Sequence, residues 1–351
     1  MMKPALKFPT VFVLSLLLIF SVSCKKDQNS IDPPVLDSGY EAEEAAVIMT
    51  LAAIAYTAEI HGVQMINDSI QYLLSDSTLA TKGEWELAWG PGVDQYNTNL
   101  VYVAKNNTTH PASYAIAIRG TSIGSLVDIL ENAKVFTLVP FKYGIEGDSI
   151  AIGSMEGLDI LLSTRDPITD HTLAEFLTQI AGVEKKKMYI TGHSQGGALA
   201  PLLSYWFITS SGVVDDFNLE TYAFAGPSVS NGIFKDHFFN SLPTTADFHM
   251  VANSLDVIPY FWARYDSLIT GHIPTRVPIE YRIATTIVTD EFKLKNISYV
   301  QLDNQIDIGH YPPIDNLNQI HPSDTLRWFN HWMKVEHVHN NYLRLLGAKP
   351  I

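Results

Sequence analysis

Cysteine and positive charge are both scarce in this chain of 351 residues. The single cysteine cannot form an internal disulfide, and zinc or iron–sulfur centres held by several cysteines are excluded as well. Lys and Arg together number 23 against 37 Asp and Glu, which gives a formal net charge of −14. Nucleic acids and anionic lipids are bound by basic surfaces, so neither is an expected partner of this chain.

Charged residues of either sign make up only 17% of the chain, whereas hydrophobic residues make up 46%. This composition supplies enough apolar material for a sizeable core and too little charge for a disordered chain. The length fits one large domain with insertions or two smaller ones. We therefore expect a globular protein.

An apolar run lies close to the N-terminus. Val11–Val22 follows Lys3 and Lys7 and is shorter than a membrane-spanning helix, which is typical of a secretory signal peptide. The run ends directly before Cys24 in a segment that resembles the lipobox of bacterial lipoproteins, although Ser21 replaces the usual leucine. The resemblance implies lipidation of Cys24 and membrane attachment on the periplasmic or cell-surface side. A plain signal peptide with a coincidental cysteine is the alternative.

The stretch after Cys24 is polar and contains Pro33 and Pro34, which is typical of a tether. The chain is therefore predicted to consist of a lipoprotein signal peptide at residues 1–23, a tether at 24–36 and a single folded domain at 37–351.

Within that domain, short β-branched or aromatic runs alternate with helical stretches. The predicted strands are Leu100–Val103, Tyr114–Ile118, Met188–Thr191, Thr221–Phe224 and Phe248–Val251. The predicted helices include Ala45–Ile60, Leu173–Ile180 and Ala198–Phe207. Such alternation indicates an α/β fold with helices on both faces of a mostly buried sheet.

Two further segments carry local signals. Ser38–Glu41 has the spacing of a capping box and predicts the start of the N-terminal helix. Tyr260–Arg282 is rich in aromatic residues and contains several prolines and a glycine, which favours an inserted loop or hairpin over a regular helix.

The segment Met188–Ala200 carries the strongest chemical signal. A strand leads into Gly192-His-Ser194-Gln-Gly196 and then into an alanine-rich helix, which is the context of a nucleophile elbow. In such a turn the serine is strained and exposes its hydroxyl, while Gly192 and Gly196 allow strand and helix to approach closely. The N-terminal end of the helix would stabilise negative charge on an ester oxygen under attack.

Four blocks of the sequence resemble the lipase class 3 branch of the α/β-hydrolases, which comprises fungal triacylglycerol lipases and bacterial relatives. The blocks are Ala117–Thr121, similar to the family's oxyanion loop; Thr191–Ala200, similar to its elbow; Ala223–Asn231, similar to its A/G-P strand end; and Asn253–Pro259, similar to its acid block. The resemblance covers about residues 100 to 260. It implies an α/β-hydrolase fold, with a mostly parallel central sheet, for the catalytic domain of residues 37–351.

The resemblance further implies that Asp256 is the acid of a Ser–His–Asp triad. The chain order Ser, Asp, His then places the base after Asp256. The histidines there are His272, His310, His321, His331, His337 and His339.

His337 is preferred as the base because it lies five residues before a Tyr-Leu pair, which resembles the family's C-terminal pattern. His339 and, more distantly, His310 stay open as alternatives, since a triad is defined by geometry. His331, His337 and His339 lack a carboxylate at a known ligand spacing, so neither a metal nor a cofactor is expected.

These residues predict an acyl-enzyme mechanism in which Ser194 is the nucleophile. The resemblance implies an oxyanion hole formed by the backbone N–H groups of Thr121 and Gln195. Gln195 stands where the family usually has leucine, but the donor is the backbone N–H, so the hole is retained. We expect a carboxylic-ester hydrolase without a cofactor, acting on lipid esters.

The substrate side is less determined. The resemblance places a lid at residues 123–150, which include the apolar run Val135–Phe141; the alternative for that run is a buried core strand. The block Ile152–Gly157 departs from the family's His-x-Gly-Phe. Acylglycerols are the expected substrates. An esterase for short-chain or polysaccharide-linked esters, with sugars stacking on the aromatic segment Tyr260–Arg282, and a non-catalytic binding lipoprotein are the alternatives.

Overall fold

The computed structural model describes residues 39–58, 63–95, 99–120, 133–265, 277–310 and 325–351. The chain divides into two compact units, Met1–Val35 and Leu36–Ile351, and all described residues belong to the second. The predicted signal peptide, Cys24 and the tether lie outside the described residues. Among the residues that are described, no helix is both long and apolar enough to cross a membrane.

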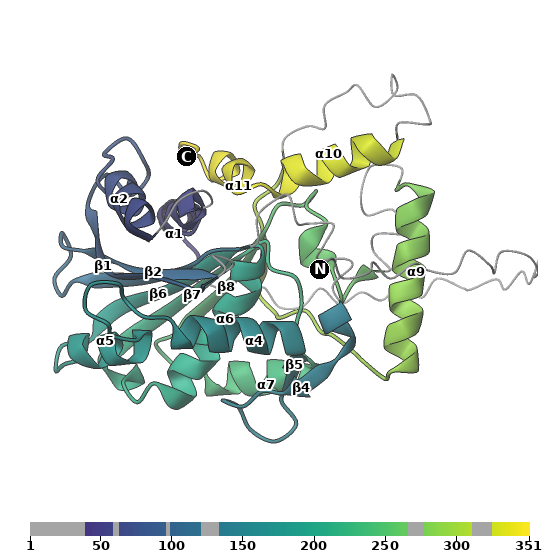
Figure 1. The fold of residues 1–351 in the computed structure, drawn as a ribbon, viewed down its shortest axis with the longest axis horizontal. Coiled ribbons are helices and arrows are strands. Elements are labelled where there is room, and N and C mark those ends of the chain that lie inside the picture. The colour runs from purple at the N-terminus through teal and green to yellow at the C-terminus, as the bar shows by residue number, and fades with distance from the viewer. Residues whose placement is uncertain (1–38, 59–62, 96–98, 121–132, 266–276, 311–324) are drawn as a thin grey trace, which may run out of the picture. The chain divides into compact units, whose positions relative to one another are not determined.

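A central sheet organises the second unit (Figure 1). Its strands are, in spatial order, β1 (Trp85–Val93), β2 (Leu100–Asn106), β3 (Ser113–Ile118), β6 (Lys186–His193), β7 (Phe217–Phe224), β8 (Asp247–Ala252) and β9 (Gln305–Asp307). Pairing is antiparallel from β1 to β3 and parallel from β3 to β9. All five predicted strands are present, and β1 and β9 were not predicted.

Helices cover both faces of this sheet (Figure 1). One face carries α1 (Ala42–Ile54), α2 (Val63–Leu74) and α11 (His339–Leu345). The other carries α4 (Ile152–Ser163), α5 (Leu173–Ile180), α6 (Gln195–Ser210) and α7 (Gly232–Ser241). Two longer helices, α9 (Ile279–Leu294) and α10 (Thr325–His337), and the short helices η1 (Ala55–Ala58), η3 (Ala133–Phe136), η4 (Val214–Asp216) and η5 (Ile258–Tyr260) complete the described part. The predicted α/β architecture is confirmed.

Strand β3 shows how the sequence produces two cores. Every residue of β3 is buried, and successive side chains of a strand point to opposite faces. Ile116 and Ile118 belong to the hydrophobic cluster beneath α4 to α7, whereas Ala115 and Ala117 belong to the cluster beneath α1 and α2. Because both faces of the strand are buried, its sequence is a continuous run of mostly apolar residues.

The N-terminal helix does not start as predicted. Its N-cap is Glu41, which is extended and makes no side-chain capping bond, so Glu41 is not the third helical residue of a capping box. Glu44, in the first turn of α1, has a different role. Its carboxylate accepts hydrogen bonds from the hydroxyls of Tyr189 and Tyr222. These bonds fasten α1 to β6 and β7, and the helix ends at Ile54 rather than Ile60.

The aromatic segment Tyr260–Arg282 also differs from the prediction. Its last four residues belong to α9, which begins at Ile279, so the prediction of a loop or hairpin is wrong there, while residues 266–276 lie outside the described residues. Phe261, Trp262 and Tyr265 are buried in the core cluster. Aromatic rings packed in a core offer no face to a sugar, which removes the support that these three residues gave to a polysaccharide substrate.

The apolar run Val135–Phe141 lies in the second half of the predicted lid, whose residues 123–132 lie outside the description. Strand β4 (Leu138–Pro140) pairs with β5 (Ser149–Ala151) in a two-stranded antiparallel sheet. Phe141 is 3% exposed, and its ring lies 5.5 Å from that of Tyr205 and 5.3 Å from that of Phe234. Leu138–Pro140 is thus a partly buried strand of a second sheet, followed by a residue packed in the core, and a moving lid stays a prediction.

If Phe141 fastens this hairpin to the core, Phe141→Ala should destabilise the fold by about 3 to 5 kcal/mol, as buried Phe-to-Ala changes do. Urea unfolding followed by circular dichroism measures this difference. Ile168→Ala, at a residue that is 80% exposed, is the control and should stay within about 0.5 kcal/mol of wild type. Equal stability of the two variants would show that the hairpin is not held in this way.

Candidate active site

Ser194 occupies a sharp turn between β6 and α6. Its φ of 61° and ψ of −122° are rare for a residue with a side chain. A β-carbon at Gly192 would overlap the backbone of Gly196, and one at Gly196 would overlap the carbonyl oxygen of Ile118. The predicted need for glycine at both positions is therefore a consequence of direct backbone contact between strand and helix.

Three side chains from distant segments meet at this turn. His337 Nε2 lies 2.8 Å from Ser194 Oγ, and His337 Nδ1 lies 2.7 Å from Asp256 Oδ2. Ser194 is the N-cap of α6, Asp256 lies in the loop after β8, and His337 is the last residue of α10. The structure thus brings the three predicted triad residues together in the order nucleophile, imidazole, carboxylate. Each is 1% exposed.

The carboxylate of Asp256 has further hydrogen-bond donors. Oδ2 also accepts from the hydroxyl of Tyr342 at 2.7 Å, and Oδ1 accepts from the backbone N–H of Ile258 at 2.9 Å. A buried charge is costly unless such donors surround it. The negative carboxylate raises the pKa of Tyr342, although burial of the phenol is the larger cause. Tyr342 therefore stays protonated and acts as a permanent donor.

A second buried carboxyl, Glu336, precedes the imidazole. Its Oε2 accepts from Asn253 Nδ2 at 2.9 Å and from Asn341 Nδ2 at 3.2 Å, while Asn253 Nδ2 also donates to the Glu336 backbone oxygen. Burial raises the pKa of Glu336. These contacts join the acid loop to the end of α10. Sequence reasoning did not assign these roles, because each contact joins residues far apart in the chain or depends on how α10 ends.

The alternative bases lie elsewhere. The ring of His339 stacks on Tyr56, with centroids 4.6 Å apart and an interplanar angle of 21°. His310 Nδ1 lies 2.7 Å from Ser254 Oγ at the surface. His331 is exposed on α10. Of the described candidates, only His337 has hydrogen-bond contacts to both Ser194 and Asp256.

Of the two predicted oxyanion donors, Thr121 lies outside the described residues. Gln195 is the first residue of α6, directly after Ser194 and at the positive end of the helix. Gly120, directly before Thr121, lies against the elbow, since a β-carbon there would overlap the carbonyl oxygen of His193. The end of β3 therefore runs beside the turn that carries Ser194.

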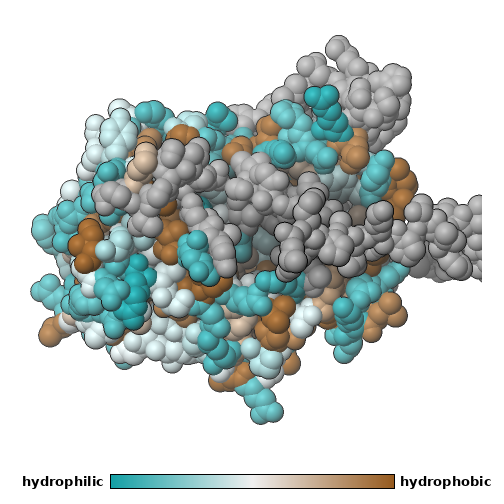
Figure 2. Space-filling view, viewed as in Figure 1, coloured by the Kyte–Doolittle hydropathy of each residue, from teal (hydrophilic) through white to brown (hydrophobic). Residues whose placement is uncertain are grey.

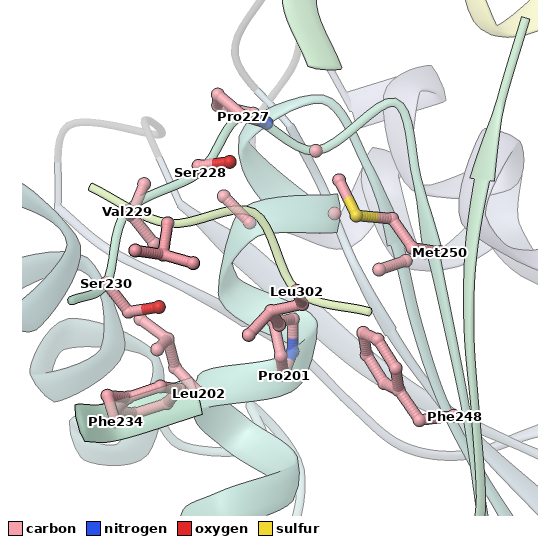
Figure 3. A pocket seen from close by; sticks show the side chains of 15 residues that line it. Pro201, Leu202, Pro227, Ser228, Val229, Ser230, Phe234, Phe248, Met250 and Leu302 are labelled. Carbon is pink, nitrogen blue, oxygen red and sulfur yellow. The ribbon is translucent and has the colours of Figure 1, made fainter. Parts of the chain in front are cut away.

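A small cavity of about 20 Å³ lies along α6 from Gly197 onwards (Figure 3). Its wall is mostly apolar and is formed by α6, the segment after β7 and strand β8. Its labelled members are Pro201, Leu202, Pro227, Ser228, Val229, Ser230, Phe234, Phe248, Met250 and Leu302. A cavity of this size has room for about one water molecule.

No group of three or more His, Cys, Asp or Glu residues within the described part of the chain is arranged to hold a metal ion.

A mostly parallel sheet with helices on both faces and a strained serine between strand and helix defines the class of this protein as an α/β-hydrolase. Residues 115–265 match the family described as lipase (class 3). This match supports the family resemblance and points to an ester-hydrolysing enzyme. No curated protein sequence matches the chain.

Solved structures agree with the fold. The crystal structure of M37 lipase has a TM-score of 0.71 at 24% identity, covering 88% of this chain and 93% of its own. A lipase from Rhizopus microsporus var. chinensis has a TM-score of 0.46 at 16% identity, covering 63% and 68%. Lipase II from Rhizopus niveus has a TM-score of 0.45 at 18% identity, covering 63% and 74%. The first of these shows the α/β-hydrolase fold for most of the chain.

The partly buried imidazole of His339 makes stability depend on pH. Burial lowers its pKa to about 4, and the neighbouring His337 adds to this shift. An unfolded histidine titrates near 6.5, so between about pH 6.5 and pH 4 the unfolded chain binds a proton that the folded chain does not. Stability therefore falls as the pH falls through this window.

His339→Phe keeps a ring on Tyr56 and removes the titration. Between pH 7 and pH 4 the free energy of unfolding of wild type should fall by up to about 3 kcal/mol more than that of the variant. Urea unfolding at a series of pH values measures both curves, and other titrating groups cancel in the comparison. Parallel curves would contradict the low pKa of His339.

Proposed function

We propose that this protein is a serine hydrolase that cleaves carboxylic esters, above all acylglycerols, through Ser194, His337 and Asp256. The hydrogen-bonded series from Ser194 Oγ through both ring nitrogens of His337 to Asp256 Oδ2 carries the proposal. A protein that only bound lipids or glycans would have no need of this series. The non-catalytic alternative is therefore disfavoured.

Catalysis begins when Ser194 Oγ attacks the ester carbonyl carbon and His337 Nε2 takes the hydroxyl proton. The resulting tetrahedral intermediate collapses, the ester C–O bond breaks, and the imidazolium gives its proton to the departing alcohol. Water then attacks the acyl-enzyme, with His337 again as base, and releases the acid and Ser194. Asp256 keeps the proton of His337 on Nδ1 and stabilises the imidazolium.

The oxyanion formed in both steps needs donors that are already in place. We assign the backbone N–H of Gln195 and, from the family resemblance, that of Thr121. The positive end of α6, a helix of 16 residues, adds to this stabilisation. The glutamine side chain in place of leucine changes the wall of the site and leaves the donor unchanged.

A lipid substrate is favoured by the match to the lipase (class 3) family. The polysaccharide-linked form of the esterase alternative loses the support of Phe261, Trp262 and Tyr265, because these side chains are buried. The face shown in Figure 2 favours neither a sugar nor a lipid substrate, because apolar and polar residues are interspersed on it.

To test the activity, residues 25–351 are assayed on p-nitrophenyl esters of increasing acyl length beside Ser194→Ala. Loss of the serine should lower kcat at least about 10³-fold while the variant stays folded. Highest kcat/KM on long acyl chains would support the lipase, and cleavage of short chains alone would support the esterase. A folded wild type no faster than Ser194→Ala on any ester would refute the hydrolase.

We further propose that the enzyme is exported and held to a membrane by a lipid on Cys24. The support is the apolar run Val11–Val22 and its small polar end directly before the cysteine. An anchor of this kind would place the hydrolase beside membrane or extracellular lipid esters.

Metabolic labelling with a radioactive fatty acid tests the anchor. The full chain should carry label in its membrane fraction, whereas Cys24→Ala should carry none, because the alanine offers no thiol for acylation. Ser194→Ala is the matched control, since it removes a side chain outside the signal and should be labelled like wild type. Equal labelling of the Cys24 and Ser194 variants, or none in wild type, would refute the anchor.

A further inference from the structure

A tyrosine at the end of the N-terminal helix touches residues on both sides of the triad. Tyr56 belongs to η1, and its hydroxyl donates to the backbone oxygen of His193 at 3.1 Å. The same hydroxyl lies 2.9 Å from His193 Nδ1. His193 directly precedes the strained Ser194, so one phenol binds both the main chain and the side chain of the residue that leads into the elbow.

Both contacts hold His193 in place. The Tyr56 hydroxyl meets the backbone oxygen and the ring nitrogen of this one residue. Burial lowers the pKa of His193 well below its ordinary value, and the neighbouring His337 and His339 act in the same direction. His193 is therefore a neutral imidazole, and its ring centroid lies 4.8 Å from that of His337.

The other side of the same tyrosine holds the chain that follows the base. His339 comes two residues after His337, and its ring stacks on Tyr56 at 4.6 Å. Val338 between them is the N-cap of α11 and is extended, with φ −58° and ψ 137°. The chain thus turns sharply between the base and the stacked ring. Movement of residue 339 would carry His337 with it.

We propose that Tyr56 and His339 are positioning residues that set the distance between Ser194 Oγ and His337 Nε2. Tyr56 fixes the residue before the nucleophile by hydrogen bonds and fixes the residue after the turn from the base by stacking. Neither side chain is assigned contact with the substrate. This inference rests on the proposed function, because it concerns the same nucleophile and base.

Three variants test the hydrogen bonds of Tyr56 and its stacking with His339 separately. Tyr56→Phe removes both hydrogen bonds and keeps the ring, His339→Ala removes the stacked ring, and His339→Phe restores a ring without nitrogens. His339 Nδ1 is buried without a hydrogen-bond partner, so the stacked face and not that nitrogen is the feature that the structure uses. Tyr72→Phe, at a tyrosine that is 71% exposed on α2, is the matched control.

Two readouts report on positioning. The first is kcat and KM on a p-nitrophenyl ester, and the second is the rate at which diethyl p-nitrophenyl phosphate inactivates the enzyme by reacting with Ser194. Tyr56→Phe and His339→Ala should each lower kcat and the inactivation rate about tenfold, with KM within about twofold, since small misplacements of reacting groups have effects of this order. His339→Phe should recover most of the loss, and Tyr72→Phe should match wild type.

Several results would contradict the positioning role of Tyr56 and His339. Wild-type kcat in folded Tyr56→Phe or His339→Ala would overturn the proposal, as would a loss no larger than the unfolded fraction measured by circular dichroism. A raised KM with unchanged kcat would make these residues substrate contacts. His339→Phe as inactive as Ser194→Ala would make His339 the base. If Tyr56→Phe does not fold, the two His339 variants still decide.

Failure of the proposed function has a different signature. In that case Ser194→Ala would hydrolyse the ester as fast as wild type, whatever the positioning variants do. If Ser194→Ala is inactive while Tyr56→Phe and His339→Ala behave as wild type, the hydrolase stands and only the positioning role is refuted.

Discussion

The contact between bare backbones at the start of α6 is the constraint on which the rest of the site depends. Gly192, Gly196 and Gly197 lie so close to neighbouring main chain that a β-carbon at any of them would overlap it. This contact brings the helix directly onto the ends of β3, β6 and β7 and forces Ser194 into its positive φ. The seven-stranded sheet and α6 together hold the strained backbone of Ser194. This arrangement places the serine hydroxyl and the first N–H groups of α6 close together.

A serine held in this way needs a neighbouring base that can accept its proton, and here that base is a buried imidazole. When His337 gains a proton, the new positive charge has no water around it and depends on Asp256. The hydrogen-bond partners of Asp256, namely the imidazole, the Tyr342 hydroxyl and the Ile258 N–H, hold that carboxylate in place before the reaction begins. The site is thus built in layers, and each outer contact serves to keep an inner group in one protonation state and one place.

How far the sequence predicts this structure depends on the range of the interaction. The parallel strands, α5 and the elbow follow from local patterns, because each is set by neighbours in the chain. The start of α1 was predicted wrongly because the spacing of a capping box does not ensure its hydrogen bonds, and Glu41 is the N-cap without any side-chain capping bond. The aromatic segment was misjudged because periodicity does not show whether Trp262 faces solvent or core. The spacing of His337 before the Tyr-Leu pair favoured the residue that contacts Ser194 and Asp256, whereas the packing of His339 on Tyr56 joins the two ends of the domain and has no local signal.

The segment that matches the lipase (class 3) family, residues 115–265, holds the nucleophile and the acid but not the base. His337, Tyr342 and His339 come from the C-terminal helices, and Tyr56 comes from the N-terminal one. These two ends of the domain meet on one face of the sheet, where α1 and α11 share a hydrophobic cluster. The apolar contact between the ends therefore has a chemical consequence: it completes a triad that the central segment cannot form alone. A fold of this kind can vary widely at its ends only as long as the imidazole still reaches the elbow.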